Sequence, residues 1–227
     1  MLGHELRNPL APMTTALQLM RMRGVSSREQ DVLERQVAQL SRLVDDLLDV
    51  SRVSRGAVEL RRAPIELCAV VLRAAETASP MLEHRHQRLD LHVATSGLGI
   101  YADIDRMAQV VTNLLTNASR YSKPETTITV SGSRTGDRVA LRIRDEGVGI
   151  APEMLERIFE PFVQHRRRPD GTVGGLGLGL SIVRALVEAH GGTVRVTSDG
   201  ENLGSEFVIE LPATDVAPVE TCEDVQM

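Results

Sequence analysis

Two hydrophobic patterns divide the chain. Up to about Arg55, apolar residues recur at alternating spacings of four and three, which is the heptad rhythm of packed helices. The positions are Leu6, Leu10, Met13, Leu17 and Met20, then Leu33, Val37, Leu40, Val44 and Leu47. Between the two runs lies Gly24-Val25-Ser26-Ser27, where Ser26 or Ser27 can cap a second helix. The pattern predicts a helical hairpin over residues 1–62.

This predicted hairpin has one apolar seam on each helix. A single hairpin of this kind cannot enclose a core, so two copies are expected to pair as a four-helix bundle. We therefore expect a homodimer. The alternative is that the hairpin packs against the rest of its own chain.

The second region, residues 63–213, mixes helices with strands. Helical patterns run from Ile65 to about Arg85, from Asp103 to Ala118 and from Leu178 to His190, the last one closed by two glycines. Five stretches alternate apolar and polar residues, as half-buried strands do: RLDLHV, TITVSGS, RVALRIRD, TVRVTS and EFVIEL. This order predicts an α+β sandwich with helices on one face of a mixed sheet. Residues 214–227 are acidic and lack periodicity, which favours a disordered tail or linker.

Composition narrows the class of protein. The 227 residues are 42% hydrophobic, enough for a core, and carry a net charge of -5 with scattered basic residues, which argues against nucleic acid as a partner. The two cysteines match no metal or disulfide spacing, which favours a reducing compartment. No apolar run reaches the roughly 18 residues of a membrane span. The expected location is the cytoplasm.

Polar residues follow one side of the predicted helix that begins near Asp103. Gln109, Asn113 and Asn117 are four residues apart, opposite the apolar face, and Arg120 and Tyr121 stand at the end of this stripe. Amide oxygens beside a basic residue suit a Mg²⁺ ion that also carries phosphates. An ordinary solvated helix face is the alternative.

Asp145 ends the predicted strand RVALRIRD. Side chains alternate along a strand, so Asp145 shares a face with the apolar residues Val139, Leu141 and Ile143. A carboxylate on a buried face needs a donor, for which an adenine amine is suitable, and Gly147 and Gly149 open the backbone beside it. The alternative is an aspartate that turns outward in a DEG turn.

A glycine-rich stretch, GGLGLGLSIV, leads into the last predicted helix. Gly175, Gly177 and Gly179 permit unusual backbone angles, and free amides at a helix start attract phosphate, so the stretch could cradle a triphosphate. It is not a P-loop, because no Gly-Lys-Ser/Thr occurs. The preceding QHRRRPDGTV is polar and basic and is expected to form a mobile lid.

In order, QVVTNLLTNASRY, DEGVGI, IFEPFVQ and GGLGLGLSIV resemble the N, G1, F and G2 boxes of the GHKL ATPase fold, which gyrase, MutL and sensor histidine kinases share. GHELRNPL resembles the phosphoacceptor box of the histidine kinases. The resemblance covers nearly all of residues 2 to 212. It implies a dimerising phosphoacceptor hairpin followed by an ATP-binding domain of the GHKL type.

The resemblance also implies roles for individual residues. Asn117 would ligate Mg²⁺ with Asn113 close by, Arg120 would approach the phosphates of ATP, and Tyr121 would pack on adenine while Asp145 accepts from its amine. The remaining implied residues shape the pocket and brace the lid: Gly147, Gly149, Gly175, Gly177, Gly179, Phe159 and Phe162.

His4 is the implied nucleophile that attacks the γ-phosphate. Imidazole has an unperturbed pKa of about 6.5, so most of it is neutral near pH 7. Glu5 can accept the proton of one ring nitrogen, and Asn8, one helical turn on, could orient water for hydrolysis of phosphohistidine. By position alone, His4 is a solvent-facing histidine near a frayed end.

The resemblance implies ATP-dependent autophosphorylation on His4 and transfer to an aspartate of a response-regulator receiver domain, with phosphatase activity as a second function. A non-kinase GHKL switch or ATP-binding scaffold is the alternative, but those ATPases usually carry a Glu in place of Asn113. The PFVQ form resembles hybrid kinases. Only three residues precede His4, so we expect a longer parent protein, which could attach to a membrane through an upstream region.

Overall fold

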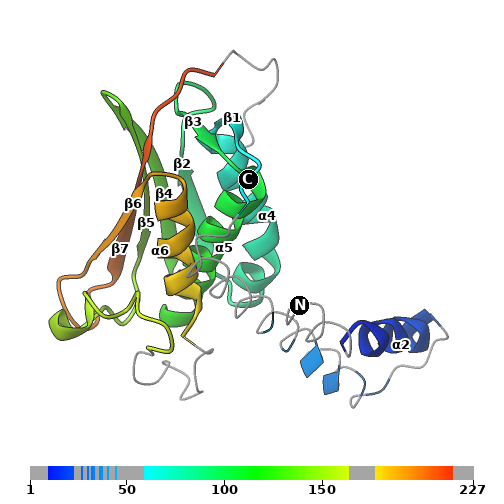
Figure 1. Cartoon of the computed structure of the whole chain (residues 1–227). Coiled ribbons are helices and arrows are strands. Elements are labelled where there is room, and N and C mark those ends of the chain that lie inside the picture. The colour runs from blue at the N-terminus through cyan, green and yellow to red at the C-terminus, as the bar shows by residue number, and fades with distance from the viewer. Residues whose placement is uncertain are drawn as a thin grey trace. The chain divides into compact units, whose positions relative to one another are not determined.

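The computed structural model describes residues 10–22, 27, 30, 32–33, 36–37, 40, 44, 59–163 and 177–216. The chain forms two compact units, Met1–Ala57 and Val58–Met227 (Figure 1). Four of the predicted site residues, His4, Glu5, Asn8 and Gly175, lie outside the described residues. So do the whole of the predicted lid, residues 164–173, and most of the predicted tail, of which residues 217–227 are not described.

The first unit contains helix α2, Leu10–Met22, and a second stretch whose described residues between 30 and 44 are all helical. Ser27 caps this second stretch, because its Oγ accepts a hydrogen bond from the backbone N–H of Gln30 (3.2 Å). The Gln30 side chain is buried and donates to the carbonyl of Leu17 (3.4 Å). The two helical segments are therefore tied together by a buried polar contact.

The predicted apolar seam of the hairpin is only partly covered within one chain. Leu17 and Val37 are buried. Large apolar side chains at other seam positions are exposed: Met13 (51%), Met20, Leu33 and Leu40. Exposed apolar residues at regular helical spacing mark a surface that can be covered by another helix.

The second unit is a two-layer α/β sandwich. Its elements are β1 (Ala63–Glu66), α4 (Leu67–His84), β2 (Arg88–His92), β3 (Gly99–Ala102), α5 (Ile104–Tyr121), β4 (Thr127–Thr135), β5 (Arg138–Asp145), the 3₁₀ turn Pro152–Met154, α6 (Gly179–Ala189), β6 (Thr193–Thr197) and β7 (Ser205–Pro212). The main sheet has the order β2-β4-β5-β7-β6, in which only β2 and β4 are parallel neighbours. The three helices cover one face of it (Figure 1).

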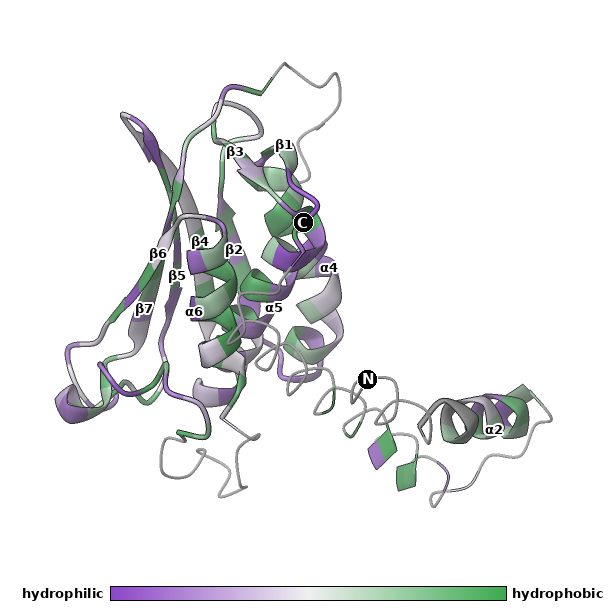
Figure 2. Cartoon of the chain, in the orientation of Figure 1, coloured by the Kyte–Doolittle hydropathy of each residue, from purple (hydrophilic) through white to green (hydrophobic). Residues whose placement is uncertain are grey.

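Strand alternation separates the two faces of this sheet. On β5, Val139, Leu141 and Ile143 are buried toward the helices. The helices are amphipathic, and Figure 2 shows both hydrophobic and hydrophilic turns on α4 and α6. The opposite face of the sheet is polar and carries cross-strand ion pairs: Arg142–Glu206 (3.6 Å) and Arg195–Glu210 (2.8 Å).

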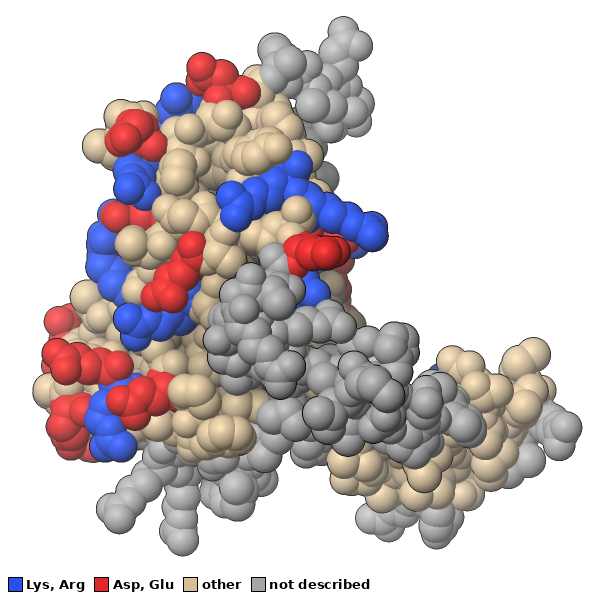
Figure 3. Space-filling model, viewed as in Figure 1, with Lys and Arg blue, Asp and Glu red and all other residues tan. Residues whose placement is uncertain are grey.

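On the face shown in Figure 3, Lys and Arg side chains lie beside Asp and Glu side chains over the second unit. Among the described residues, no helix is both long enough and apolar enough to cross a lipid bilayer.

The predicted helix from Ile65 is wrong at its first turn. Ile65 and Glu66 belong to β1, which pairs with β3 in a separate antiparallel ribbon, Ile65 opposite Ile100. The Glu66 carboxylate accepts hydrogen bonds from the N–H groups of Gly97 (3.1 Å) and Leu98 (3.0 Å). Both strands are only four residues long and are formed by long-range pairing, which a local periodicity does not reveal.

Asp103 joins the start of α5 to the segment that precedes β1. Its Oδ1 accepts from the N–H groups of Asp105 and Arg106, and its Oδ2 accepts from the N–H of Arg61 (2.9 Å). Burial alone would raise the pKa of Asp103, but these backbone hydrogen bonds outweigh it and lower the pKa. The carboxylate is therefore both a helix cap and an anchor for the incoming chain.

His190 closes α6 as a buried, neutral side chain. Its Nδ1–H donates to the carbonyl of Leu186 (2.7 Å), and its Nε2 accepts from the N–H of Asp103 (3.1 Å). Burial lowers the pKa of His190. This ring links the end of α6 to the start of α5.

The chain continues along β3 after β7. Ala213 forms a bridge with Ile100, and the N–H of Thr214 donates to the carbonyl of Gly99 (2.9 Å). Asp215 pairs with Arg134 (3.3 Å). The described chain therefore stays in contact with the domain at Thr214 and Asp215, within the stretch for which the sequence predicted a tail.

Replacing Asp103 by alanine should lower the free energy of unfolding by about 1–2 kcal/mol at pH 7, because the α5 cap and the Arg61 contact are lost together. Urea unfolding measures this loss. The lowered pKa means that the contribution is fully present above the ordinary value of 3.8 and disappears as the pH falls through the lower value in the folded protein. Asp105→Ala, which removes only an exposed pair with Arg73 (2.5 Å), should cost less than about 1 kcal/mol. Equal losses in the two variants would contradict the anchoring role of Asp103.

Candidate functional site

Two groups of predicted site residues, those at the end of α5 and those around Asp145, lie in contact. Helix α5 packs between α4 and α6 and over β4 and β5 (Figure 1). The N–H of Val148, in the loop after β5, donates to the carbonyl of Tyr121 at the end of α5 (3.0 Å). The amide stripe of α5 and the loop that follows Asp145 are thus brought together by direct contact.

Asp145 is turned inward, as its place in the alternating strand predicts. It is 5% exposed. Ser205 Oγ donates to its Oδ2 (2.5 Å), and the N–H of Gly147 donates to its Oδ1 (2.8 Å). Burial raises the pKa of this carboxyl, although the hydrogen bonds from Ser205 and Gly147 act in the opposite direction. The outward turn that the sequence left open does not occur.

Close backbone packing explains the glycines around Asp145. A Cβ on Gly147 would lie 2.6 Å from Asp145 Oδ1 and 2.7 Å from the carbonyl oxygen of Tyr121. A Cβ on Gly149, whose φ is +69°, would lie 1.9 Å from the carbonyl oxygen of Gly200. A side chain at Gly147 would push the loop away from the end of α5, and one at Gly149 would push it away from Gly200 in the loop between β6 and β7.

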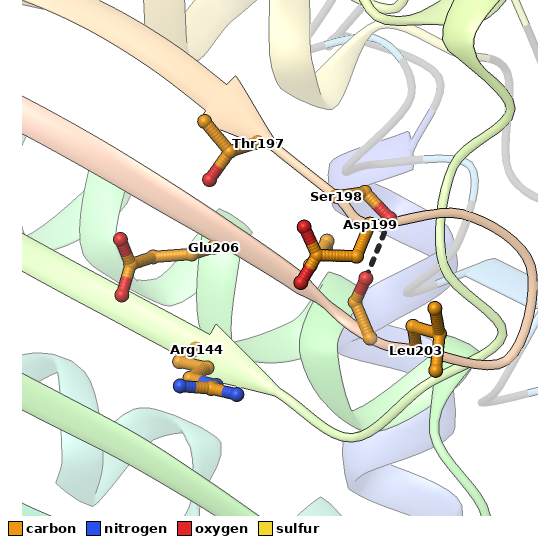
Figure 4. A pocket seen from close by; sticks show the side chains of 8 residues that line it. Arg144, Thr197, Ser198, Asp199, Leu203 and Glu206 are labelled. Carbon is orange, nitrogen blue, oxygen red and sulfur yellow. Dashed lines mark hydrogen bonds between the residues drawn. The ribbon is translucent and has the colours of Figure 1, made fainter.

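The loop between β6 and β7 supports the loop after Asp145. Ser198 Oγ accepts from the N–H of Ile150 (3.0 Å) and donates to the carbonyl of Gly204 (2.6 Å; Figure 4). The N–H of Asn202 donates to the carbonyl of Val148 (2.7 Å). Two loops that are distant in sequence therefore hold each other in place.

A hollow of about 190 Å³ lies beside this loop, and Arg144, Asp199 and Glu206 are among the residues that line it (Figure 4). Arg144 and Glu206 adjoin Asp145 and Ser205 in β5 and β7, so strand alternation turns them to the opposite face of the sheet. Arg144 and Glu206 therefore place the hollow on the outer sheet face, although Gly204 and Ser205, which pack against Asp145, also line it.

The amide stripe has one incomplete hydrogen-bond arrangement. Asn113 and Asn117 are half-buried on α5. Within the described part of the chain, Asn113 Nδ2 is buried without a hydrogen-bond partner. A buried amide without a partner is costly, and a bound group could complete its bonding. The described residues contain no cluster of three His, Cys, Asp or Glu side chains that could hold a metal ion. A Mg²⁺ ion here would therefore depend on amide oxygens and on the oxygens of its ligand, which Mg²⁺ accepts.

Arg120 and Tyr121 are half-buried in the last turn of α5. Their helical positions follow Asn113 and Asn117 toward the Asp145 loop, as the stripe predicted. The structure thus brings Asn113, Asn117, Arg120 and Tyr121 onto one helix that reaches Asp145 through the contact between Tyr121 and Val148.

The two predicted phenylalanines have different surroundings. Phe159 is buried edge-to-face against Phe207 of β7 (6.3 Å between ring centres), with the Arg184 guanidinium 5.8 Å from its ring centre. Phe162 has a side chain that is 62% exposed, and its backbone N–H donates to the carbonyl of Gly177 (3.0 Å). This bond joins the described residues that precede residue 164 to those that follow residue 176.

Gly177 and Gly179 lead into α6. Gly177 has a φ of +73°, and a Cβ on it would lie 2.6 Å from the carbonyl oxygen of Val163. Gly179 is the first residue of α6, and no described atom lies within 4 Å of where its Cβ would be. Only at Gly177 does close packing of the chain require glycine.

Three residues of this region were not identified from the sequence. Ser205 holds Asp145, Ser198 holds Ile150, and Gly204 leaves room for the backbone of Asp145, which a Cβ would approach to 2.1 Å. They lie in or beside a loop about 60 residues after Asp145, and only the pairing of β5 with β7 brings them to it. A Ser before an alternating strand carries no local signal of such a contact.

The second unit is a two-layer α/β domain of the ATPase class. It carries an amide-lined helix, a buried aspartate and a helix that starts at a glycine, and a helical hairpin precedes it in the chain. The family model of "Histidine kinase-, DNA gyrase B-, and HSP90-like ATPase" matches residues 102–215, and that of the "His Kinase A (phospho-acceptor) domain" matches residues 1–56. The chain therefore belongs to the histidine kinase-, DNA gyrase B- and HSP90-like ATPase family and is a histidine kinase catalytic core. The expected fold is confirmed.

Named relatives agree with this assignment. The chain is 35% identical to the alginate biosynthesis sensor protein KinB of Pseudomonas aeruginosa, over 92% of this chain and 36% of KinB. It is also 35% identical to the sensor protein RstB of Escherichia coli (strain K12), over 93% of this chain and 47% of RstB. The chain thus spans between about a third and a half of the length of these curated relatives.

Two solved structures share the fold. Full-length ShkA in complex with AMPPNP superposes with a TM-score of 0.81 at 31% identity, over 96% of this chain and 46% of ShkA. The histidine kinase AdeS of Acinetobacter baumannii superposes with a TM-score of 0.67 at 29% identity, over 93% of this chain and 98% of that one.

Asp145→Asn should leave the unliganded protein at least as stable as the wild type at pH 7. An amide can accept from Gly147 N–H and donate to Ser205 Oγ, without burying a charge. Because the pKa of Asp145 is raised in the folded protein, ionisation of Asp145 destabilises the wild type as the pH rises above 3.8 toward the raised value. Thermal unfolding across this range should show the decline in the wild type and a smaller one in Asp145→Asn. Parallel pH profiles would contradict burial as the cause.

Proposed function

We propose that the chain is the catalytic core of an ATP-dependent protein histidine kinase that phosphorylates its own His4 and passes the phosphoryl group to an aspartate of a response-regulator receiver domain. One observation carries the proposal: a buried, inward-facing carboxylate, Asp145, lies beside an amide-lined helix on which Asn113 has an unsatisfied buried amide. The family matches over residues 1–56 and 102–215 support it.

Asp145 recognises the adenine. Ser205 and Gly147 occupy only part of the acceptor capacity of its two oxygens, so a further lone pair can accept from the exocyclic amine. Gly147 and Gly149 keep the surrounding backbone close and the space beside the carboxylate free of side chains. Tyr121, which is tied to the same loop, packs on the base.

The phosphates extend along α5 toward the start of α6. Asn117, with Asn113 close by, holds the Mg²⁺ ion, and Arg120 contacts the phosphates. When bound, the ion would neutralise phosphate charge and help to orient the terminal phosphoryl group. Gly175, which lies outside the described residues, shapes the phosphate pocket with Gly177 and Gly179, and Phe159 and Phe162 support the segment above it.

His4 is the phosphoryl acceptor. One neutral ring nitrogen attacks the γ-phosphorus, a nitrogen–phosphorus bond forms, the bond to the bridging oxygen breaks, and ADP leaves. Glu5 accepts the proton from the other ring nitrogen. The same imidazole phosphate then passes its phosphoryl group to the receiver aspartate, and Asn8 orients water in the phosphatase reaction.

The residue at position 113 favours transfer to a protein acceptor. Hydrolytic members of the fold would need a base there to activate water, and an amide has no basic lone pair at neutral pH. A non-kinase ATPase switch is therefore not favoured.

We assign residues 1–62 to the dimerising phosphoacceptor hairpin, residues 63–213 to the catalytic domain and residues 214–227 to a tail or linker. A phosphoacceptor domain of this family implies dimerisation. The exposed seam residues Met13, Met20, Leu33 and Leu40 support a homodimer, because a second hairpin would cover them. Cys68 and Cys222 match no disulfide spacing, which supports a reducing cytoplasm as the location.

Incubation of the purified chain with γ-labelled ATP and Mg²⁺ should label it with a phosphoryl group that acid releases, because phosphoimidazole is acid-labile. His4→Gln should abolish the label while nucleotide binding and thermal stability stay unchanged. His92→Gln, which alters an exposed histidine paired with Asp90 (3.0 Å), is the matched control and should keep full labelling. Acid-stable label, or label that survives in His4→Gln, would refute the kinase assignment.

Asn117→Ala should weaken binding of Mg²⁺-ATP about tenfold or more, because a ligand of the ion is lost, while binding of ATP in the presence of EDTA changes little. Titration calorimetry with and without Mg²⁺ separates the two. Thr112→Ala, on the same helix but off the amide stripe, should bind like the wild type. A loss of equal size in EDTA would argue against a metal ligand at position 117.

A further inference from the structure

Residues of the turn between α4 and β2 form hydrogen bonds with the last turn of α5 and the residues that follow it. Gln87 in this turn is buried, and its side-chain nitrogen Nε2 donates to the carbonyls of Ser119 (3.1 Å) and Lys123 (2.9 Å). Its oxygen Oε1 accepts from Ser119 Oγ (2.5 Å), and Ser119 is fully buried. Both polar atoms of the Gln87 side chain, Nε2 and Oε1, are therefore hydrogen-bonded at the C-terminal end of α5.

Arg85 adds a second contact from the same turn. Its Nη2 donates to the carbonyl of Ser122 (2.8 Å), and its backbone carbonyl accepts from the N–H of Glu125 (3.2 Å). His86 between them has a φ of +53°, a conformation that a non-glycine residue rarely adopts. The turn thus keeps a strained backbone while its two long side chains reach the same helix end.

These contacts satisfy carbonyls that a helix leaves without partners. Of the last four carbonyls of α5, Ala118 accepts from Ser122 N–H (3.1 Å), Ser119 accepts from Gln87, and Tyr121 accepts from Val148 N–H (3.0 Å). Two of these donors come from other elements, the turn before β2 and the loop after Asp145. The end of α5 is therefore held from both sides.

We propose that Gln87 is a positioning residue for nucleotide binding: by clamping the last turn of α5, it holds Arg120 and Tyr121 in register with Asp145. This inference rests on the proposed function of Asp145, Arg120 and Tyr121. Gln87 acts through α5 and does not contact the nucleotide. The coupling runs through Tyr121, because Val148 binds its carbonyl and the neighbouring Gly147 binds the Asp145 carboxylate.

Glutamine suits this position because the end of α5 presents both kinds of group. Two carbonyl oxygens need a donor and one hydroxyl needs an acceptor, which a single amide supplies. Methionine fills a similar volume but leaves all three groups unpaired. Glutamate would place its carboxylate oxygens against the two carbonyl oxygens.

The test measures nucleotide affinity and stability separately in the full chain. Gln87→Met should raise the dissociation constant for ATP, measured by displacement of a fluorescent ATP analogue, about tenfold, as expected when binding groups shift out of position. Ser119→Ala, which removes only the hydroxyl contact, should raise it about threefold and provides the measurement if Gln87→Met does not fold. The thermal unfolding temperature of each variant is recorded without nucleotide.

Leu67→Ala is the matched control for lost stability. Leu67 is buried, but it lies near Gly132, toward the end of β4 that is remote from Asp145. It should lower the unfolding temperature at least as much as Gln87→Met and leave the dissociation constant unchanged. Wild-type affinity in both clamp variants, or an equal rise in Leu67→Ala, would overturn the positioning role. Absence of ATP binding by the wild type would instead overturn the proposed function, and the inference with it.

Discussion

The site of the second unit depends on burying the Asp145 carboxylate at the end of a strand. A carboxylate in an apolar layer is stable only if donors surround it, and here Ser205 and the N–H of Gly147 supply them. Those donors require β7 to lie in register beside β5 and the following loop to turn back sharply. The glycines, the Ser198 contacts and the attachment of Tyr121 all serve to keep that loop close.

Helix α5 connects the loop after Asp145 to other parts of the domain, because both of its ends are hydrogen-bonded to other segments. At its start, Asp103 caps the helix and also binds the segment that leads in from the first unit. At its end, the Gln87 side chain of the α4–β2 turn donates to the carbonyl of Ser119, and the backbone N–H of Val148 donates to the carbonyl of Tyr121. A helix fixed at both ends presents its polar stripe in a constant position, which a nucleotide site requires because misplacement of about 1 Å can cost large factors in rate.

The hairpin and the sandwich differ in how far a single chain buries their apolar surfaces. The sandwich buries its apolar surface between helices and sheet within one chain. The hairpin leaves four apolar side chains exposed: Met13, Met20, Leu33 and Leu40. A second hairpin would cover them, which agrees with the dimerisation that a phosphoacceptor domain implies. Stability of the hairpin should accordingly depend on protein concentration, while that of the sandwich should not.

The sequence determined the elements with strong periodicity, because burial of one face imposes a period of 3.6 on helices and of two on strands. It therefore predicted the helical hairpin, the five strands of the main sheet and the amide stripe of α5. It left open whether Ser26 or Ser27 caps the second helix and whether Asp145 turns inward, and the structure has the Ser27 cap and the inward carboxylate. Only the tertiary structure decided that Ile65 and Glu66 form a strand with Gly99–Ala102, that Ser205 holds Asp145, and that Gln87 holds the end of α5. Those contacts join residues some 30 to 60 positions apart, and their donors and acceptors follow no local period that a chain read on its own could reveal.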